Sequence, residues 1–353
     1  MKGITIYRFY QKGLSLIELM ISMLLGIFII SSVTQVFLSS NDSNRLNFQL
    51  GLMQEAARIA MSSMSNDVRM AGYTGCIDES SIGNALLQNN ASNEWLTAEQ
   101  PLQGMDLSDT QSKMDALATS ESLLIFKLDP DNVFAVTNHD TATGTLTLDS
   151  NVGSTLSSGD AAALTRQDCS QVALIALSSI SGNTVTHTTS GSGDFRNCVT
   201  QLKGAFRCYD SSSPTGALSF NPGYLKPVSS VGYFVKLDNG LPTLFRKEAG
   251  TANALPVVDG VEDIRIHYGL DTDNDGVANR YISAGDRSFR HADWLQTTSI
   301  RIHLLTRSES EVLPVPAPAA PPRTYLFDGT QVTQTDRFLR REYVMTMALR
   351  NKG

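Results

Sequence analysis

An unbroken apolar run near the N-terminus constrains this chain more than any other feature. Residues 14–38 (LSLIELMISMLLGIFIISSVTQVFL) contain a single charged side chain, that of Glu18. As an α-helix this run would measure about 37 Å, which exceeds the hydrocarbon core of a bilayer at about 30 Å. The run therefore predicts one membrane-spanning helix.

The segment before this run predicts how the helix is oriented. Residues 1–13 carry Lys2, Arg8 and Lys12 and no acidic residue. Positive charge marks the cytoplasmic end of a span, so we expect a cytoplasmic N-terminus. A cleaved secretory signal fits poorly, because its apolar region is usually about 7–15 residues long. A plain anchor leaves Glu18 unexplained, since an unpaired carboxylate inside a membrane costs a few kcal/mol.

Residues 12–20 (KGLSLIELM) resemble the class III leader of type IV prepilins and type II secretion pseudopilins, where Gly usually precedes Phe-Thr-Leu-Ile-Glu-Leu. The resemblance implies that a prepilin peptidase cleaves after Gly13 and that Leu14 becomes the N-methylated first residue. Leu14 stands where Phe is commoner and Ser15 where Thr is commoner, and both differences from the usual motif are mild. Glu18 then matches the glutamate five residues into the mature chain. Paired with the α-amino group of a neighbouring subunit, it is expected to drive filament assembly.

The helix is predicted to continue past the membrane with one apolar face. Residues spaced three and four apart form this stripe: Leu46, Leu50, Met53, Ala57, Ala60, Met64, Val68 and Ala71. Four charged residues fall off it: Glu55, Arg58, Asp67 and Arg69. Gly72 offers a C-cap. One helix from Leu14 to about Ala71 follows, and its second half is expected to pack on the protein's own globular part.

Three separated segments narrow the resemblance to the PilW family of minor pilins. They are residues 54–76 (QEAARIAMSSMSNDVRMAGYTGC), 261–276 (VEDIRIHYGLDTDNDG) and 336–352 (DRFLRREYVMTMALRNK). The resemblance implies a structural subunit that helps to initiate type IV pilus assembly at or near the pilus tip. It also implies partners: other minor pilins, the major pilin, the prepilin peptidase and a tip adhesin.

Beyond residue 122 the chain predicts an antiparallel β-rich head. Short apolar runs lie between Gly, Asn, Asp and Pro turns, at 123–128, 133–139, 145–149, 172–180, 184–189, 231–237, 243–248, 264–270, 299–307 and 343–350. No helical run of 10–15 residues separates them, which argues against a parallel sheet. Residues 314–322 (PVPAPAAPP) are expected to form an extended loop between the last two strands.

These patterns together predict an α+β, pilin-like fold, with a long N-terminal helix packed on an antiparallel β-rich head of two β subdomains. The expected divisions are a prepilin leader at 1–13, a transmembrane half of the helix at 14–38, an amphipathic half at 39–73 and a periplasmic head at 74–353.

The four cysteines are expected to form disulfides, because the head should lie in the oxidising periplasm. They are Cys76, Cys169, Cys198 and Cys208, they include no CxxC motif, and their spacings fit no zinc site. Three connectivities are possible. We favour a local Cys198–Cys208 loop and a Cys76–Cys169 bridge from the helix end to the sheet, with free buried thiols as the alternative.

An acidic loop offers a candidate Ca²⁺ site. Asp271, Asp273 and Asp275 precede Gly276, as at positions 1, 3, 5 and 6 of a calcium loop, with the Val277 carbonyl and Asn279 at positions 7 and 9. Position 12 is Ile282 rather than Glu, so this is not an EF-hand; Asp286 or Asp293 is a candidate further ligand. The plain alternative is an acidic turn.

Other functions find little support in the sequence. A pI near 5.3 and a net charge of −7 argue against a nucleic-acid binder. The histidines, at 139, 187, 267, 291 and 303, form no HExxH pair, and neither GxSxG nor GxxxxGK[ST] occurs, so we expect no enzyme. His267 and His303 lie in alternating strands, where surface positions explain them better than catalysis does.

The predicted function is therefore that of a minor pilin in the bacterial inner membrane and in the pilus at the cell surface. The nearest alternative is a type II secretion minor pseudopilin, although the 340 residues left after cleavage (353 − 13) argue against the smaller members. An alternative of another class is a membrane-anchored periplasmic binding protein, which would keep its N-terminal segment uncleaved.

Overall fold

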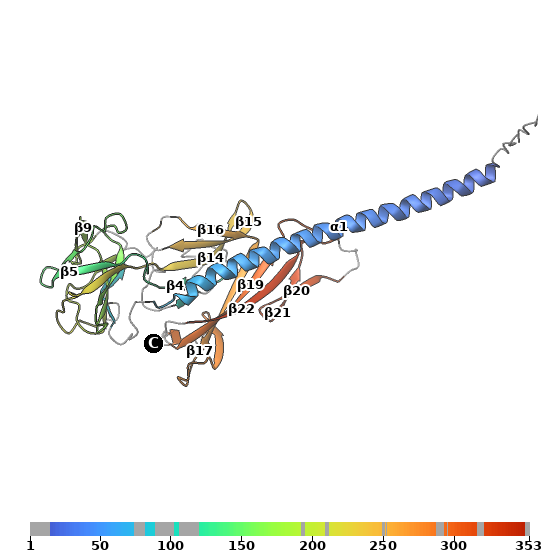
Figure 1. The fold of residues 1–353 in the computed structure, drawn as a ribbon. Coiled ribbons are helices and arrows are strands. Elements are labelled where there is room, and N and C mark those ends of the chain that lie inside the picture. The colour runs from blue at the N-terminus through green and yellow to red at the C-terminus, as the bar shows by residue number, and fades with distance from the viewer. Residues whose placement is uncertain are drawn as a thin grey trace, which may run out of the picture.

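A single long helix and a strand-rich head make up the protein. The computed structural model describes residues 15–73, 82–88, 102–105, 120–191, 195–208, 212–248, 251, 253–286, 293–294, 296–315 and 321–349. Helix α1 (Leu16–Arg69) has 54 residues. Its N-terminal half stands clear of the head, and its C-terminal half lies across the sheets (Figure 1).

Both ends of α1 are defined by local hydrogen bonds. The Ser15 hydroxyl accepts from the Glu18 amide (3.2 Å), which satisfies an otherwise unpaired N–H of the first turn. Met70 is the C-cap, and Gly72 follows in the left-handed conformation (φ 71°) that favours glycine. The Gly72 amide donates to the Phe126 carbonyl (2.8 Å), which ties the helix end to the head.

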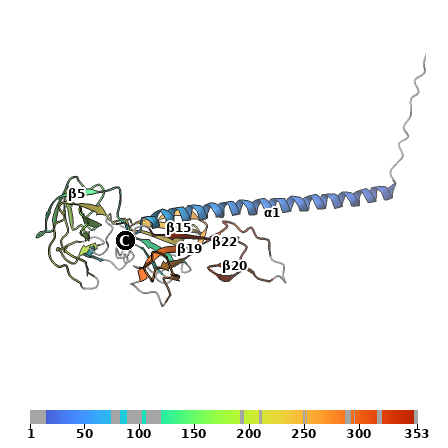
Figure 2. The ribbon, with the colours of Figure 1, turned by 60° about the horizontal axis from the view of Figure 1, so that its bottom comes forward.

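Two antiparallel sheets lie beneath the C-terminal half of α1, and we call them the proximal unit (Figure 2). One has the spatial order β16 (Leu255–Asp259), β15 (Leu241–Glu248), β14 (Val231–Asp238), β4 (Ser122–Ile125) and β3 (Leu102–Met105). The other has the order β18 (Arg280–Ser283), β17 (Val261–Leu270), β19 (Thr297–Arg307) and β22 (Arg340–Ala348). A hairpin of β20 (Arg323–Phe327) and β21 (Thr330–Gln334) follows β19 in the chain.

The rest of the described head, the distal unit, lies beyond the C-terminal end of α1 (Figure 1). Its nine-stranded sheet has the order β12 (Phe206–Arg207), β1 (Ile82–Asn84), β8 (Val172–Ala176), β7 (Ala161–Arg166), β13 (Gly223–Pro227), β5 (Phe134–Asp140), β6 (Thr145–Leu148), β10 (Thr184–Thr186) and β9 (Ser179–Ser181). A separate pair joins β2 (Leu86–Gln88) to β11 (Phe195–Asn197). Strand β1 runs parallel to both of its neighbours, β12 and β8.

Apolar packing also connects the two units. Strands β4 and β14 pair directly, with Ile125 opposite Val231, although most of the distal unit lies between them in the chain. One hydrophobic cluster fills the space between α1 and the proximal sheets, and a second fills the distal unit. A third, which includes Leu124, Phe126 and Leu174, joins residues of both units. The distal unit is thus packed against the proximal one as well as tethered to it.

The predicted fold class is confirmed: a long N-terminal helix lies on a strand-rich, multi-sheet antiparallel head. The helix prediction agrees with the observed α1 to within two residues at each end. The sequence analysis did not predict several of the strands, and β7 shows why. Its sequence, AAALTR, is rich in Ala, which has low strand propensity, yet it is almost wholly buried in the middle of the distal sheet.

The prediction that 314–322 alone joins the last two strands is wrong. The hairpin of β20 and β21 intervenes before β22. Asp328 (φ 48°) and Gly329 (φ 71°) form its two-residue turn, and positive φ at both central positions is the type I′ geometry that Asp-Gly favours. Residues 316–320 lie outside the described part of the chain.

Candidate assembly helix, disulfides and acidic loop

The N-terminal half of α1 presents a continuous apolar surface. Large apolar side chains between Leu16 and Leu38 are 47–80% exposed. A window of 18 residues in this helix has a mean hydropathy of 2.3, and none of it is buried within the chain. Soluble proteins rarely expose so much contiguous apolar surface. This half of α1 is therefore a candidate membrane anchor.

Glu18 lies in the first turn of this exposed half, on the surface of the helix. A carboxylate in the first turn is favoured by the partial positive charge at the N-terminus of a helix. The predicted processing residues Gly13 and Leu14 lie outside the described residues, so only Glu18 of the predicted assembly site has a described position. Its exposure leaves the carboxylate accessible to a neighbouring chain.

Hydroxyl side chains within the apolar half are bonded to their own helix. Ser31, Ser32 and Thr34 donate to the carbonyls four residues earlier, at 2.8–2.9 Å, and Ser22 donates to Leu19. A lipid environment offers no water to satisfy a free hydroxyl. These bonds make the hydroxyl side chains of this segment compatible with a membrane.

The C-terminal half of α1 buries the apolar stripe predicted from the sequence. Ala60, Met64 and Val68 are fully enclosed, and Met53 and Ala57 are nearly so. The small alanines allow the helix backbone to approach the sheets, while the methionines fill the gaps between them. The same helix thus changes from an exposed apolar surface to a buried apolar stripe.

One polar residue in the buried half was missed by the sequence analysis, which placed Asp67 off the packed stripe. Asp67 is only 7% exposed. Its carboxylate bonds Lys127 Nζ (2.6 Å), Arg246 Nε (2.9 Å) and the Tyr233 hydroxyl (2.7 Å). All three partners lie far along the chain, so periodicity on the helix alone could not reveal them. Asp67 fastens the end of α1 to the proximal unit.

The electrostatics of this cluster favour ionised Asp67. Burial opposes ionisation of the carboxyl, but hydrogen bonds from Arg246, Lys127 and Tyr233 outweigh that cost and hold the pKa of Asp67 below its ordinary value. Burial, reinforced by the Asp67 charge, raises the pKa of Tyr233 far above its ordinary value. Tyr233 therefore remains a hydrogen-bond donor at any physiological pH.

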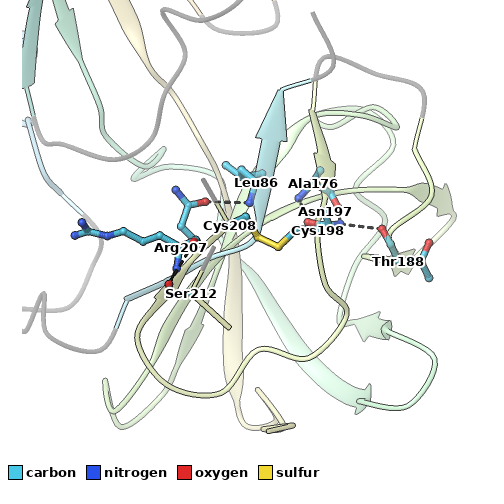
Figure 3. The surroundings of a disulfide bond; sticks show 9 residues. Leu86, Ala176, Thr188, Asn197, Cys198, Arg207, Cys208 and Ser212 are labelled. Atoms are coloured by element: carbon cyan, nitrogen blue, oxygen red, sulfur yellow. Dashed lines mark hydrogen bonds between the residues drawn. A yellow bond between two sulfur atoms is a disulfide. The ribbon is translucent and has the colours of Figure 1, made fainter. Parts of the chain in front are cut away.

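Disulfides are present in the distal unit, and Figure 3 shows one of them in its surroundings. Cys198 and Cys208 are joined, with their Cα atoms 6.1 Å apart. The neighbouring Asn197 side chain bonds the Ala176 backbone through both amide atoms, which holds the start of this loop against β8. Cys169 is also disulfide-bonded, and Cys76 lies outside the described residues.

The predicted acidic residues converge in the loop between β17 and β18. Carboxylate oxygens of Asp271, Asp273 and Asp275 lie within 4.8 Å of one another. Asp271 accepts from the amides of Asp275 (3.2 Å) and Gly276 (2.8 Å), and Asp275 accepts from the Val277 amide (2.8 Å). The positive φ of Asn274 (62°) and Gly276 (86°) closes the turn.

The donor set of this loop suits a hard cation. Burial opposes ionisation of Asp271, but backbone N–H groups, that of Gly276 foremost, hold its pKa below the ordinary value. Carboxylate oxygens are the ligands that Ca²⁺ prefers. Asn279 Oδ1 accepts from the Thr272 amide (2.7 Å), and Asp286 and Asp293 are not members of the close carboxylate group. The three carboxylates are therefore the residues whose ligand atoms already lie close together.

Two pairs of histidines come together in the described structure, and neither pair could be predicted from sequence spacing. His139 and His187 are buried in the distal unit with their Nε2 atoms 3.0 Å apart. Burial lowers the pKa of His139 to about 4 and that of His187 to about 3. His267 and His303 lie on neighbouring strands of the proximal unit, with ring centroids 5.2 Å apart.

Comparison with known proteins finds similarity to pilus proteins. The family model for PilW, Type IV Pilus-assembly protein W, matches residues 232–351. Among solved structures, the "Type IV-like pilin TTHA1219 from Thermus thermophilus" is 12% identical over 87% of this chain and 97% of its own, with a TM-score of 0.28. No curated protein matches the chain.

The family match covers about a third of the chain, so it shows that this part of the head is similar to PilW proteins. The matched range contains the 261–276 segment and most of the 336–352 segment, on which the sequence-based resemblance partly rested. It begins within β14 and covers the proximal sheets beyond it, so it leaves out α1 and the distal unit.

Proposed function

We propose that this protein is a minor pilin that primes assembly of type IV pili and is located at or near the pilus tip. The observation that carries the proposal is the contrast along α1, whose apolar N-terminal half is exposed while its C-terminal half is packed on the head. An exposed apolar helix of this length needs a membrane or the helices of other subunits around it.

In this proposal the prepilin peptidase cleaves after Gly13, and the α-amino group of Leu14 is N-methylated. The helix crosses the inner membrane with its N-terminus in the cytoplasm and its head in the periplasm. Glu18 pairs with the α-amino group of an adjacent subunit, which offsets the cost of burying its charge only when the two subunits are docked. The partners are other minor pilins, the major pilin and a tip adhesin.

The direct test replaces Glu18 with Ala in the producing bacterium and counts surface pili. We expect membrane insertion to be unchanged and pilus number to fall at least tenfold, because the docked ion pair is lost. Glu55→Ala is the matched control, since Glu55 is an exposed glutamate on the same helix outside the apolar half. Wild-type pilus numbers in the Glu18→Ala strain would refute this mechanism.

Sequencing the N-terminus of the mature protein separates the proposal from its main alternative. A minor pilin begins at N-methylated Leu14, whereas a membrane-anchored periplasmic binding protein retains residues 1–13. A type II secretion pseudopilin would share the processed N-terminus. Deletion of the gene distinguishes that case, because loss of pili with intact secretion supports a pilin and the reverse supports a pseudopilin.

We also propose that the loop of Asp271, Asp273 and Asp275 binds Ca²⁺, with the Val277 carbonyl and Asn279 as further oxygen donors. The close approach of three carboxylates supports this, because a divalent cation relieves their mutual repulsion. Calorimetric titration of the full chain in detergent should show one Ca²⁺ equivalent that Asp273→Asn weakens at least tenfold. Asp238→Asn, at the end of β14, is the control, and the absence of heat with the wild type would overturn the proposal.

A further inference from the structure

The outer face of the sheet formed by β17, β19 and β22 carries a polar cluster that pilus assembly does not explain. His267 and His303 alternate with the buried residues Ile266 and Ile302, so their rings point away from the core under α1. His267 is paired with Arg301 across the two strands, and His303 is therefore its diagonal neighbour. This placement brings the two imidazoles within reach of one small ligand.

The hairpin of β20 and β21 adds a carboxylate to these imidazoles. Asp328, in its type I′ turn, places Oδ1 2.7 Å from His267 Nε2 and 3.7 Å from His303 Nε2. These three ligand atoms all lie within 4.8 Å of one another. Three different elements of the chain, β17, β19 and the hairpin turn, thus converge on one point.

A fourth residue orients the cluster. Glu342, on β22, accepts a hydrogen bond from His303 Nδ1 (2.7 Å) and another from the Asp328 amide (2.9 Å). A proton on Nδ1 leaves the lone pair of His303 on Nε2, directed toward Asp328. A carboxylate behind the imidazole is the arrangement that commonly supports metal-bound histidine.

We propose that His267 Nε2, His303 Nε2 and Asp328 Oδ1 bind a divalent transition-metal ion of the zinc type, with Glu342 as a positioning residue. Tetrahedral zinc at about 2.1 Å from each ligand would set the ligand atoms about 3.4 Å apart. The 2.7 Å contact must lengthen and the 3.7 Å contact must shorten, each by less than about 1 Å. Such shifts lie within the reach of side-chain rotation.

Charge and donor type support a transition metal over a hard cation. Two neutral imidazoles and two carboxylates leave a net charge that one divalent ion balances, and imidazole suits zinc better than Ca²⁺ or Mg²⁺. The side chains keep 15–28% exposure, so solvent can complete the coordination. The bound ion would fix the hairpin turn to β17 and β19.

The competing interpretation is a hydrogen-bond network without metal, in which His267 Nε2 donates a proton to Asp328. Metal binding must displace that proton. The two interpretations therefore make opposite predictions for the protein stripped of metal and then titrated with zinc.

The experiment uses the full chain without an affinity tag, in detergent micelles, after treatment with a chelator. We expect calorimetry to show one zinc equivalent with micromolar or tighter affinity, and excess Ca²⁺ not to compete. His267→Ala and Asp328→Asn should each weaken binding at least 100-fold, and Glu342→Gln about tenfold, as for other residues that support metal ligands. Asp238→Asn, at the end of β14 and outside the cluster, should bind as the wild type does.

Cobalt supplies a readout independent of affinity, because four-coordinate Co²⁺ with nitrogen ligands absorbs visible light strongly. The wild type should show this absorption and His267→Ala should lose it, while near-ultraviolet circular dichroism shows the variant still folded. No zinc binding by the wild type would leave the hydrogen-bond network as the correct interpretation. Equal binding by the wild type and by both His267→Ala and Asp328→Asn would also overturn the proposal.

Discussion

The two halves of α1 differ in where they place their apolar side chains. Both are apolar along one side or more, yet the first half leaves its apolar side chains exposed and the second buries them on the proximal unit. The carboxylates of Asp67, in the second half, and Glu18, in the first, differ in the same way. Asp67 has its partners within the chain, whereas the carboxylate of Glu18 is exposed and available for another molecule.

This difference separates residues that serve folding from those that serve assembly. A change in the second half should lower the stability of the isolated subunit, because the partners of that half are already in place. A change in the first half should leave the subunit as stable as before and act only when other chains surround it. The following predictions test that division in the purified full chain in detergent micelles.

The largest effect is expected for Asp67→Asn. Removing one partner of a buried ion pair leaves uncompensated charge, which typically costs about 3–5 kcal/mol. We expect the free energy of unfolding to fall by about 3 kcal/mol, measured by urea unfolding followed by near-ultraviolet circular dichroism. Glu18→Gln should leave the same quantity unchanged. Equal effects of the two substitutions would break the proposed division of the helix.

A comparable contrast is expected for apolar side chains. Met64 is fully buried, so Met64→Ala should lower the free energy of unfolding by about 2–3 kcal/mol through lost contacts and a cavity. Leu24 lies on the exposed half, so Leu24→Ala should leave the free energy of unfolding unchanged within measurement error. A clear loss with Leu24→Ala would show that the first half also packs within the subunit.

A smaller effect is expected on how the free energy of unfolding changes at acidic pH. The pKa of Asp67 is lower in the folded protein than in the unfolded chain, so its contribution is complete above the unfolded value near 4 and is lost as the pH falls through the folded value. Between pH 6 and pH 3 the wild type should therefore lose more stability than Asp67→Asn does. Subtracting the two pH profiles removes the contribution of other groups, including His139 and His187. Parallel profiles would contradict the role given to Asp67.

The smallest effect is expected at the exposed pair of Glu55 and Arg58. Solvent screens this ion pair, so Glu55→Ala should not change the free energy of unfolding beyond measurement error. The same urea titration checks this. A loss as large as that of Met64→Ala would mean that exposure is a poor guide to the energetic role of residues on this helix.

The sequence predicted what depends on local order along the chain. Hydropathy located the exposed half of α1, a spacing of three and four residues located its buried stripe, and Asp-Asn-Gly spacing located the acidic loop. It failed where residues distant in sequence meet. Lys127, just after β4, and Arg246, on β15, both reach Asp67, and the turn at Asp328 reaches His267 only after β20 and β21 have paired. A single sequence contains no signal for such contacts.

The junction at the end of α1 has a mechanical consequence. The Gly72 amide donates to the Phe126 carbonyl, and the Leu128 amide donates to the Tyr73 carbonyl. The two residues that follow the helix end are therefore hydrogen-bonded to the segment that leads from β4 into the distal unit. Tension applied along α1 would therefore reach the distal unit through these bonds as well as through the core of the proximal sheets. Under such a load the two units would move as one rigid body, and the distal sheet would bear tension together with the proximal unit.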